Sequence, residues 1–165
     1  MKIAIIADLH DQLINLKKFL NFCQNNKIKK IVCLGDVSRE ETIIYLARNF
    51  SGDIFLVRGN ADLYDKSILK QFSNIIDCQE IGSKKIGQVN IIFFHEPIKI
   101  KKAPLNKFKA DFIFYGHTHK PWLEKKAGYF FANPGNLAGI YYNATFATLD
   151  TTSKNLELII LGKVN

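Results

Sequence analysis

The sequence predicts an α/β fold in which two sheets pack face to face, with helices on the outside. Up to about residue 60, short apolar runs alternate with segments of helical periodicity, which is typical of a parallel sheet with crossover helices. After about residue 65 the apolar runs follow one another with glycines between them, which indicates consecutive strands. Because 47% of the residues are hydrophobic, the chain can bury a sizeable core, and we expect a single domain over residues 1–165.

The first half of the chain predicts strands and helices in alternation. Short apolar runs indicate buried strands at residues 2–7, 30–34 and 53–57. Residues 12–26 form an amphipathic helix in this interpretation, with Asp11 as its cap and an apolar face of Leu13, Leu16, Leu20 and Cys23. The next helix is expected after Ser38, which starts a capping-box pattern with Glu41, and its apolar face contains Ile43, Leu46, Ala47 and Phe50.

The second half predicts mainly sheet. One short helix is expected near residues 67–72. Strands are expected near residues 84–86, 90–94, 112–115, 122–125, 129–132, 145–150 and 156–161. Gly82, Gly87 and Gly128 are expected in the turns between them.

Charge and cysteine content narrow the classes of partner. The formal net charge of +8 favours anionic partners. The densest lysine cluster fits a solvated loop or, alternatively, steering of a phosphate-bearing substrate; it consists of Lys99, Lys101, Lys102, Lys107 and Lys109. With just three arginines, nucleic acid is expected only as a substrate. The cysteines lack C-x-x-C spacing and are expected to be reduced and to hold no structural zinc: Cys23, Cys33 and Cys78.

Nothing in the sequence points to a membrane or to export. No apolar run reaches the roughly 18 residues of a membrane span. The N-terminal apolar run is interrupted by Asp8 and His10 and lacks the features of a signal peptide. We therefore expect a cytoplasmic protein without a membrane partner.

The features that carry chemistry are five short motifs, each of which directly follows an apolar run. They are Asp8-Leu9-His10, Gly35-Asp36, Gly59-Asn60-Ala61-Asp62, His95 and Gly116-His117-Thr118-His119. All four histidines of the chain lie in them. Ligands of open α/β sheets bind at the carboxyl ends of the strands, so these side chains are expected to converge, as a cluster of metal ions requires.

Each motif residue has an ordinary structural explanation when it is taken alone. Asp8 or Asp36 could cap a helix, and Asn60 could be a turn residue. For all the motif residues together this explanation fails, because Asp8 and Asp36 would lie buried and close together. Without a metal ion their charges would repel each other.

In these motifs, and in their order, the sequence resembles the calcineurin-like metallophosphoesterase superfamily. The resemblance runs from residue 3 to about residue 150. The short length and the Asn133-Pro134-Gly135 turn are similar to the small bacterial and archaeal phosphodiesterase branch. The resemblance implies a four-layer α/β/β/α sandwich of two mixed sheets flanked by helices.

The resemblance also implies two divalent metal ions and the residues that hold them. Asp8, His10 and His119 would bind one ion, and Asp36 would bridge to the other, which is bound by Asn60, His95 and His117. Carboxylate and imidazole ligands suit Mn²⁺, the ion we expect first, with Zn²⁺, Fe, Ni²⁺ or Mg²⁺ as alternatives. Two such ions hydrolyse phosphate diesters through attack of a bridging hydroxide. The catalytic group in this prediction is Asp36, Asn60, His95 and Asp62.

Two departures from the family pattern affect the predicted reaction. Ala61 stands where most members carry a histidine that protonates the leaving group or stabilises the phosphoryl charge, so a modest rate and a preference for good leaving groups are expected. Asp62 could serve as a general acid, although bracing its loop is the favoured role. Glu96-Pro97 follows His95, which could stiffen that loop and narrow the substrate range.

Substrate contacts are predicted for Arg39, Asn133 and Asn136. Arg39 lies close to Asp36 in the sequence and could contact a phosphate, but a surface position at a helix start is an equal alternative. Asn133 and Asn136 could line the mouth of the site or could be plain turn residues.

Three functions compete. The first is a phosphodiesterase acting on a small phosphate ester. The second is a phosphomonoesterase or nucleotidase. The third is a non-catalytic scaffold, because the phosphoesterase-like subunit of retromer shares this fold. The complete set of seven ligands argues against the scaffold. Formation of a homo-oligomer is open; Ile140, Tyr141 and Tyr142 could form a contact surface, but ordinary packing is the favoured interpretation.

Overall fold

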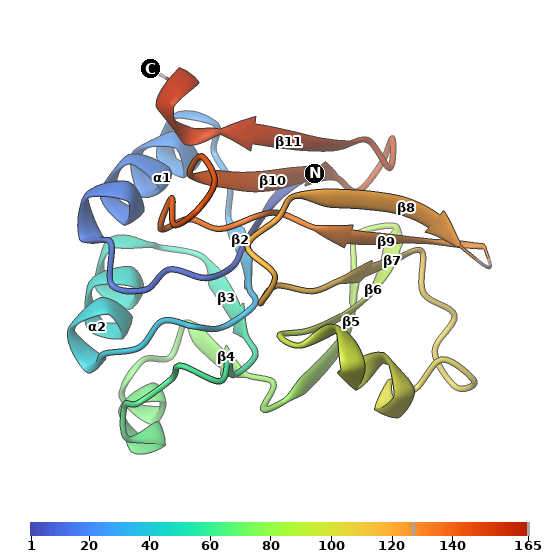
Figure 1. The fold of residues 1–165 in the computed structure, drawn as a ribbon, viewed down its shortest axis with the longest axis horizontal. Helices are drawn as coiled ribbons and strands as arrows, with labels where there is room; N and C mark the ends of the chain where they lie inside the picture. Colours follow the sequence, from blue (N-terminus) through green and yellow to red (C-terminus); the bar gives the residue numbers. More distant parts are fainter. Residues whose placement is uncertain (127, 165) are drawn as a thin grey trace.

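The computed structural model describes residues 1–126 and 128–164 and shows two mixed sheets packed face to face (Figure 1). The first sheet has the order β11-β10-β1-β2-β3-β4. Its parallel strands are β1 (Lys2–Ile6), β2 (Lys30–Cys33), β3 (Asp53–Leu56) and β4 (Ile75–Asp77). Its antiparallel strands are β10 (Thr145–Asp150) and β11 (Leu156–Ile160).

The second sheet has the order β5-β6-β7-β9-β8. Its central strands run parallel: β6 (Val89–Phe94), β7 (Phe112–Phe114) and β9 (Tyr129–Asn133). The edge strands β5 (Ile81–Ile86) and β8 (Trp122–Lys126) are antiparallel to their neighbours. The predicted α/β fold of two mixed sheets is therefore confirmed.

The helices cover the outer face of the first sheet. In Figure 1, α1 (Leu13–Asn25) and α2 (Glu40–Asn49) lie on the side of that sheet away from the second one. Leu16, Phe19 and Leu46 pack there against Ile6 and Ile31 of the sheet, all at most 1% exposed. A 3₁₀ segment η1 (Lys66–Gln71) precedes β4, close to the predicted short helix, and η3 (Leu161–Lys163) follows β11.

The core between the sheets is apolar from both sides. Ile3, Ile5 and Val32 of the first sheet belong to one buried cluster with residues of the second, among them Ile91, Phe93, Phe112 and Phe114. Two sheets that share one core are consistent with the predicted single domain, which stays a prediction.

The outer layer on the second sheet differs from a regular helical layer. It consists of the 3₁₀ segment η2 (Pro97–Lys102) and the loop after it, from which Ile100 and Phe108 cover Phe94 and Ile113. Pro97, Pro104 and the lysines between and after them leave too few apolar residues for an amphipathic α-helix. Lys99 pairs with Glu80 at 3.3 Å and with Glu96 at 3.7 Å, and the other lysines of the cluster are exposed, as the solvated-loop interpretation predicts.

Two predicted helix caps are wrong. The Ser38 side chain does not cap α2, and Asp11 does not cap α1, whose first turn has no side-chain cap. Instead Asp11 Oδ1 accepts hydrogen bonds from the backbone nitrogen of Arg39 (3.1 Å) and from the Thr42 hydroxyl (2.6 Å). Asp11 therefore anchors the start of the neighbouring helix α2, an arrangement that local sequence spacing cannot indicate.

Gly82 was expected in a turn and lies instead within β5. A Cβ atom at this position would come within 2.2 Å of the Phe93 ring on the neighbouring strand. The glycine is needed because the aromatic ring lies flat against its backbone. Gly87 and Gly128 lie between strands, as predicted, and both have a positive φ.

Cys23 and Cys33 are buried and Cys78 is partly buried, and all three are free. Within the described residues, none of the helices combines the length and the apolar character that crossing a bilayer requires.

Candidate metal centre

The predicted metal ligands meet where strands of both sheets end. Asp8 and His10 follow β1, Asp36 follows β2, and Asn60 follows β3 of the first sheet. His95 directly follows β6, and the turn of His117 and His119 follows β7 of the second sheet. The structure thus brings all seven side chains to one edge of the sandwich.

One group of donor atoms contains Asp8, His10 and His119. The Nε2 atoms of His10 and His119 are 3.1 Å apart. His119 Nε2 lies 3.5 Å from Asp8 Oδ1, and His10 Nε2 lies 3.7 Å from Asp36 Oδ2.

The other group contains Asn60, His95 and His117. Asn60 Oδ1 lies 2.9 Å from His95 Nε2 and 2.7 Å from His117 Nδ1, and these two nitrogens are 3.3 Å apart. His95 Nε2 is also 3.3 Å from Asp36 Oδ2. A single oxygen, Asp36 Oδ2, therefore faces both groups.

These donors fit divalent metal ions. Ligand atoms that lie about 2.0–2.2 Å from one ion are separated from each other by roughly 3–3.5 Å. The donor atoms here are 2.7 to 3.7 Å apart, which is close to that spacing. The potential donor atoms of Asp8, His10 and His119 all lie within 4.8 Å of one another, as do those of Asp8, Asp36 and His95. Imidazole nitrogens that approach each other this closely gain most from a shared cation.

Hydrogen bonds outside the donor set orient the ligands. His95 Nδ1 lies 2.8 Å from the carbonyl oxygen of Leu34, which can only accept, so Nδ1 carries a proton and Nε2 is the atom that faces Asn60 and Asp36. The backbone nitrogen of His117 donates to both carboxylate oxygens of Asp8 at 3.1 Å. The backbone nitrogen of Ala61 donates to Asp36 Oδ1 at 2.8 Å, so the other oxygen of Asp36, Oδ2, is the one that faces the two donor groups.

The backbone at the ligands is left-handed, an uncommon conformation for residues other than glycine. Five of the seven predicted ligands have a positive φ: Asp8 (54°), His10 (39°), Asp36 (54°), His117 (68°) and His119 (59°). Each costs roughly 1–2 kcal/mol relative to right-handed backbone. Strain of this kind is concentrated at functional sites.

Close approach of the backbone explains one glycine of the motifs. A Cβ atom on Gly59 would lie 2.0 Å from Asp36 Oδ1. Any other residue at position 59 would displace the carboxylate that faces both groups.

Burial and hydrogen bonding shift the pKa values of Asp8 and Asp36 in opposite directions. Asp8 is fully buried, and burial raises its pKa to about 7, although the charge of His95 works against this shift. Burial also acts to raise the pKa of Asp36, but the hydrogen bond and charge of His95 outweigh it and hold the Asp36 pKa below its ordinary value. Conversely, burial acts to lower the pKa of His95, and Asp36 raises it overall. A bound cation would favour the ionised form of both carboxylates.

Comparison with known proteins identifies the family of this chain. A model described as the calcineurin-like phosphoesterase superfamily domain matches residues 1–154. The chain belongs to this superfamily. The prediction of the family is therefore confirmed, and with it the prediction of a metal-dependent phosphoesterase.

Individual relatives of this superfamily include enzymes and a sorting protein. A phosphodiesterase of Methanocaldococcus jannaschii is 27% identical over 169 residues, which cover 98% of this chain and 99% of the relative. The vacuolar protein sorting-associated protein 29 of Schizosaccharomyces pombe is 29% identical over 144 residues, covering 84% of this chain and 73% of the relative. The solved structure of an archaeal phosphodiesterase matches the fold with a TM-score of 0.84 at 23% identity, covering 97% of this chain and 99% of that one.

Asp62, at the motif acid position of the superfamily, is engaged with loop backbone. Its Oδ1 accepts from the backbone nitrogen of Val37 at 2.7 Å, and its Oδ2 accepts from that of Gly59 at 2.8 Å and from the Tyr64 hydroxyl at 3.2 Å. The carboxylate thus ties the loop after β2 to the loop after β3. This geometry favours the bracing role over general-acid catalysis.

The predicted substrate-binding residues lie outside the centre. Asn133 and Asn136 are buried and bond to the loops around them. Asn133 Nδ2 donates to the Gly116 carbonyl (2.9 Å) and to the Thr118 hydroxyl (3.0 Å), and Asn136 Nδ2 donates to the His119 carbonyl (3.1 Å). Their placement argues against contact with substrate and for support of the histidine turn. Arg39 is exposed at the start of α2, with Nε 3.6 Å from Asp11 Oδ2, which favours the surface interpretation.

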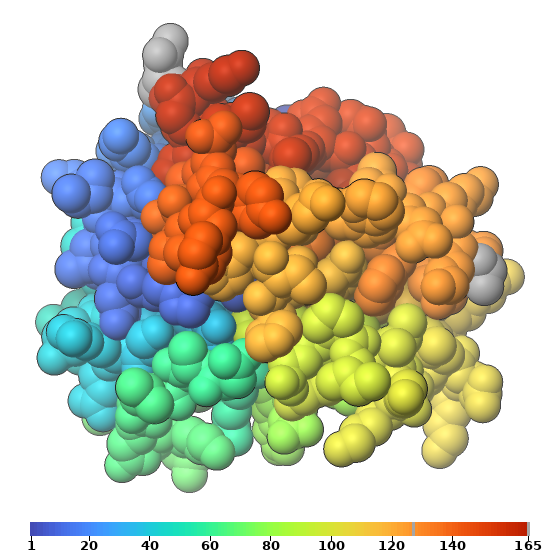
Figure 2. All heavy atoms as spheres, viewed as in Figure 1, coloured from blue at the N-terminus to red at the C-terminus, as the bar shows by residue number. Residues whose placement is uncertain are grey.

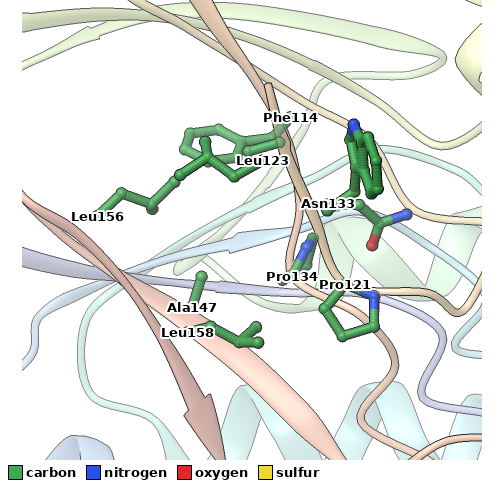
Figure 3. Close-up of a pocket in the computed structure, with 10 residues that line it drawn as sticks. Phe114, Pro121, Leu123, Asn133, Pro134, Ala147, Leu156 and Leu158 are labelled. Atoms are coloured by element: carbon green, nitrogen blue, oxygen red, sulfur yellow. The ribbon is translucent and has the colours of Figure 1, made fainter. Parts of the chain in front are cut away.

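An apolar cavity of about 160 Å³ lies elsewhere, between β8 and β9 of one sheet and β10 and β11 of the other (Figure 3). Leu123, Leu156 and Leu158 line it, and none of the seven predicted ligands does. Its lining carries no group that could perform the chemistry of a phosphoesterase.

Proposed function

We propose that this protein is a dinuclear metal-dependent phosphodiesterase. The observation that carries the proposal is the position of Asp36 Oδ2, which is 3.7 Å from His10 Nε2 of one donor group and 3.3 Å from His95 Nε2 of the other. A carboxylate shared between two sets of nitrogen ligands suits a pair of ions better than a single ion. Similarity to the phosphodiesterase of Methanocaldococcus jannaschii over nearly the whole chain supports the reaction class.

In this proposal Asp8, His10 and His119 hold one ion, Asn60, His95 and His117 hold the other, and Asp36 serves both. The ions, when bound, supply a nucleophile by lowering the pKa of water and clamp the attacking and leaving oxygens of the phosphate. The chain contributes the positions of the ligands, fixed by the backbone hydrogen bonds to Asp8 and Asp36 and by the Leu34 bond to His95.

The residues around the centre offer little to protonate a leaving group. The Ala61 side chain has no acidic proton to give to a leaving group, and both oxygens of Asp62 already accept hydrogen bonds from the backbone. We therefore expect diesters with good leaving groups to react fastest, because general acid catalysis, worth about 10²–10⁴-fold elsewhere, is missing.

The experiment is hydrolysis of bis-p-nitrophenyl phosphate under a series of divalent ions, with Mn²⁺ expected to give the highest rate and Zn²⁺, Fe²⁺, Ni²⁺ and Mg²⁺ as comparisons. Chelator should abolish turnover. Asp36→Asn and His119→Ala should each lower kcat by at least about 100-fold. Faster hydrolysis of p-nitrophenyl phosphate than of the diester would instead establish a phosphomonoesterase.

A scaffold is the second candidate, because the sorting protein of Schizosaccharomyces pombe is as similar in sequence as the phosphodiesterase is. Metal-loaded protein that shows no turnover above the Asp36→Asn variant would support it. A cytoplasmic location and the oligomeric state stay predictions.

A further inference from the structure

A shallow hollow of about 270 Å³ opens directly beside the candidate metal centre. It is lined by Tyr115, Thr118, Lys120, Trp122 and Tyr142. Thr118 and Lys120 are the chain neighbours of the predicted ligand His119, so the hollow begins where the centre ends. In Figure 2 the deep-orange loop around residue 142 lies against the lighter orange segment around residue 120, and together they form this part of the surface.

Aromatic rings stand exposed around the hollow. Trp122 is 50% exposed and Tyr142 is 46% exposed. The neighbouring Tyr141 is 90% exposed, and its ring centre lies 6.0 Å from that of His119. The packing expected from the sequence for Tyr141 is therefore wrong. Large aromatic side chains that gather in the open beside a reaction centre are available to contact a ligand.

A positive charge accompanies these rings. Lys120 Nζ lies 5.6 Å from the centre of the Trp122 ring, within range of a cation–π contact. Lys120 lies two residues before Trp122, the first residue of β8. The ammonium group thus accompanies the aromatic surface, and Lys120 directly follows the predicted ligand His119 in the chain.

We propose that this hollow binds the nucleoside side of the substrate, so that the protein acts on phosphodiesters that carry a nucleoside. The base stacks on Trp122 beside Tyr142, and Lys120 attracts the phosphate that the metal centre holds. The inference rests on the proposed function and names the substrate class of the same site. Stacking of bases on aromatic side chains is tolerant of base identity, so discrimination among the four bases should be weak.

A second copy of the chain is a poorer occupant of the same surface. Each copy has a net charge of +8, and the hollow itself carries Lys120, so like charges would oppose pairing of two copies. The same charge attracts an anionic nucleotide.

The first experiment uses Trp122, which is the single tryptophan of the chain, as a fluorescent reporter. Protein in Mg²⁺ buffer is titrated with thymidine 5′-monophosphate and, separately, with ribose 5-phosphate. We expect saturable quenching by the nucleotide alone and at least about fivefold weaker nucleotide binding to Lys120→Ala. Lys125→Ala is the matched control, because Lys125 Nζ instead lies over the Phe130 ring. Equal responses to both ligands, or none, would overturn the inference.

The second experiment compares two diesters with the same leaving group, p-nitrophenyl thymidine 5′-phosphate and methyl p-nitrophenyl phosphate. We expect kcat/KM to favour the nucleoside diester by at least about tenfold. Trp122→Ala should reduce this ratio about tenfold, mainly through KM, and Trp122→Phe should restore most of it.

Leu123→Ala is the matched control for Trp122, since Leu123 is about equally exposed on the same strand and, like Trp122, lines the apolar cavity of Figure 3, but it does not line the hollow. It should leave the ratio unchanged. A ratio near one in the wild-type protein, or equal effects of the two alanine variants, would refute the nucleoside site while leaving the phosphodiesterase intact. If neither diester is hydrolysed, the proposed function is refuted, and the fluorescence titration still decides whether the base binds.

Discussion

At the scale of single residues, the candidate centre combines strain and buried charge. The predicted ligands Asp8, His10 and Asp36 have left-handed backbone, and Asp8 is a fully buried carboxyl group. Neither feature benefits folding by itself. Both become favourable when a cation binds, because the cation compensates the buried charge and the strained backbone fixes the ligands in advance.

Asp8 gives a prediction about pH. In metal-free protein its pKa is about 7, against an ordinary 3.8, so the folded state holds a proton that the unfolded state releases. Stability from this group is present at about pH 4 and is lost as the pH rises to about 7 and above. At about 1.4 kcal/mol per pKa unit, the loss is at most about 4 kcal/mol.

Urea unfolding in chelator at pH 5 and pH 8 measures this loss, and Asp8→Asn should remove most of it. His95, whose pKa Asp36 raises, contributes a change in the same direction in both proteins. A variant with the same pH dependence as the wild-type protein would show that Asp8 is not the group responsible.

Asp62 allows the two roles considered for it to be separated. Because it accepts from the backbone of both Val37 and Gly59, Asp62→Asn would place an amide donor against at least one backbone donor. We expect a loss of about 1–3 kcal/mol in stability and an equal fall in kcat for p-nitrophenyl and phenyl diesters. Tyr64→Phe, which removes only the hydroxyl bond at 3.2 Å, is the milder control. A fall that is much larger for the phenyl ester would identify Asp62 as a general acid.

At the scale of elements, the start of α2 depends on a residue from another loop. Asp11 accepts from Arg39 N and from the Thr42 hydroxyl, whereas Ser38 makes no side-chain cap. Asp11→Ala should therefore lower the free energy of unfolding by about 1 kcal/mol, and Ser38→Ala should change it much less. Chemical denaturation of both variants measures the difference. A larger loss of stability in Ser38→Ala than in Asp11→Ala would show instead that the local capping box stabilises α2.

Features that depend on neighbouring residues could be predicted from the sequence, whereas features that depend on partners distant in the sequence could not. The strands and helices of the first half were predictable because burial imposes a period on consecutive residues, as in Leu16, Leu20 and Cys23. The three-residue strand β4 was missed because two isoleucines are too short a run to indicate a strand. Asp11 and Gly82 were misassigned because their partners, α2 and the Phe93 ring, are distant in sequence.

The candidate site also has one part that the sequence predicts and one part that it does not. The convergence of the seven side chains was predictable because each stands at the end of an apolar run, where the topology of an α/β sheet brings side chains together. The hollow formed by Lys120, Trp122 and Tyr142 was not, because it depends on how the loop before β10 lies against the start of β8. The one available signal was the position of Lys120 and Trp122 directly after the histidine turn.

At the scale of the whole molecule, the candidate centre joins the two sheets. Asp8, Asp36 and Asn60 extend from the first sheet, and His95, His117 and His119 extend from the second. An ion that takes ligands from both sheets would add a connection at the edge of the core to which Ile5 and Phe114 both belong. Binding of metal should therefore stabilise the protein as one unit.

We expect a divalent ion at 100 times its dissociation constant to raise the free energy of unfolding by about 2.7 kcal/mol per site that it fills. Hydrogen exchange should slow together in the loops after β2 and β3 of the first sheet and after β6 and β7 of the second, because their ligands share the ions. Asp36→Asn, which alters the residue facing both donor groups, should remove most of this protection in both sheets at the same ion concentration. Protection confined to one sheet would mean that only one donor group binds metal, and the dinuclear proposal would then give way to a mononuclear centre.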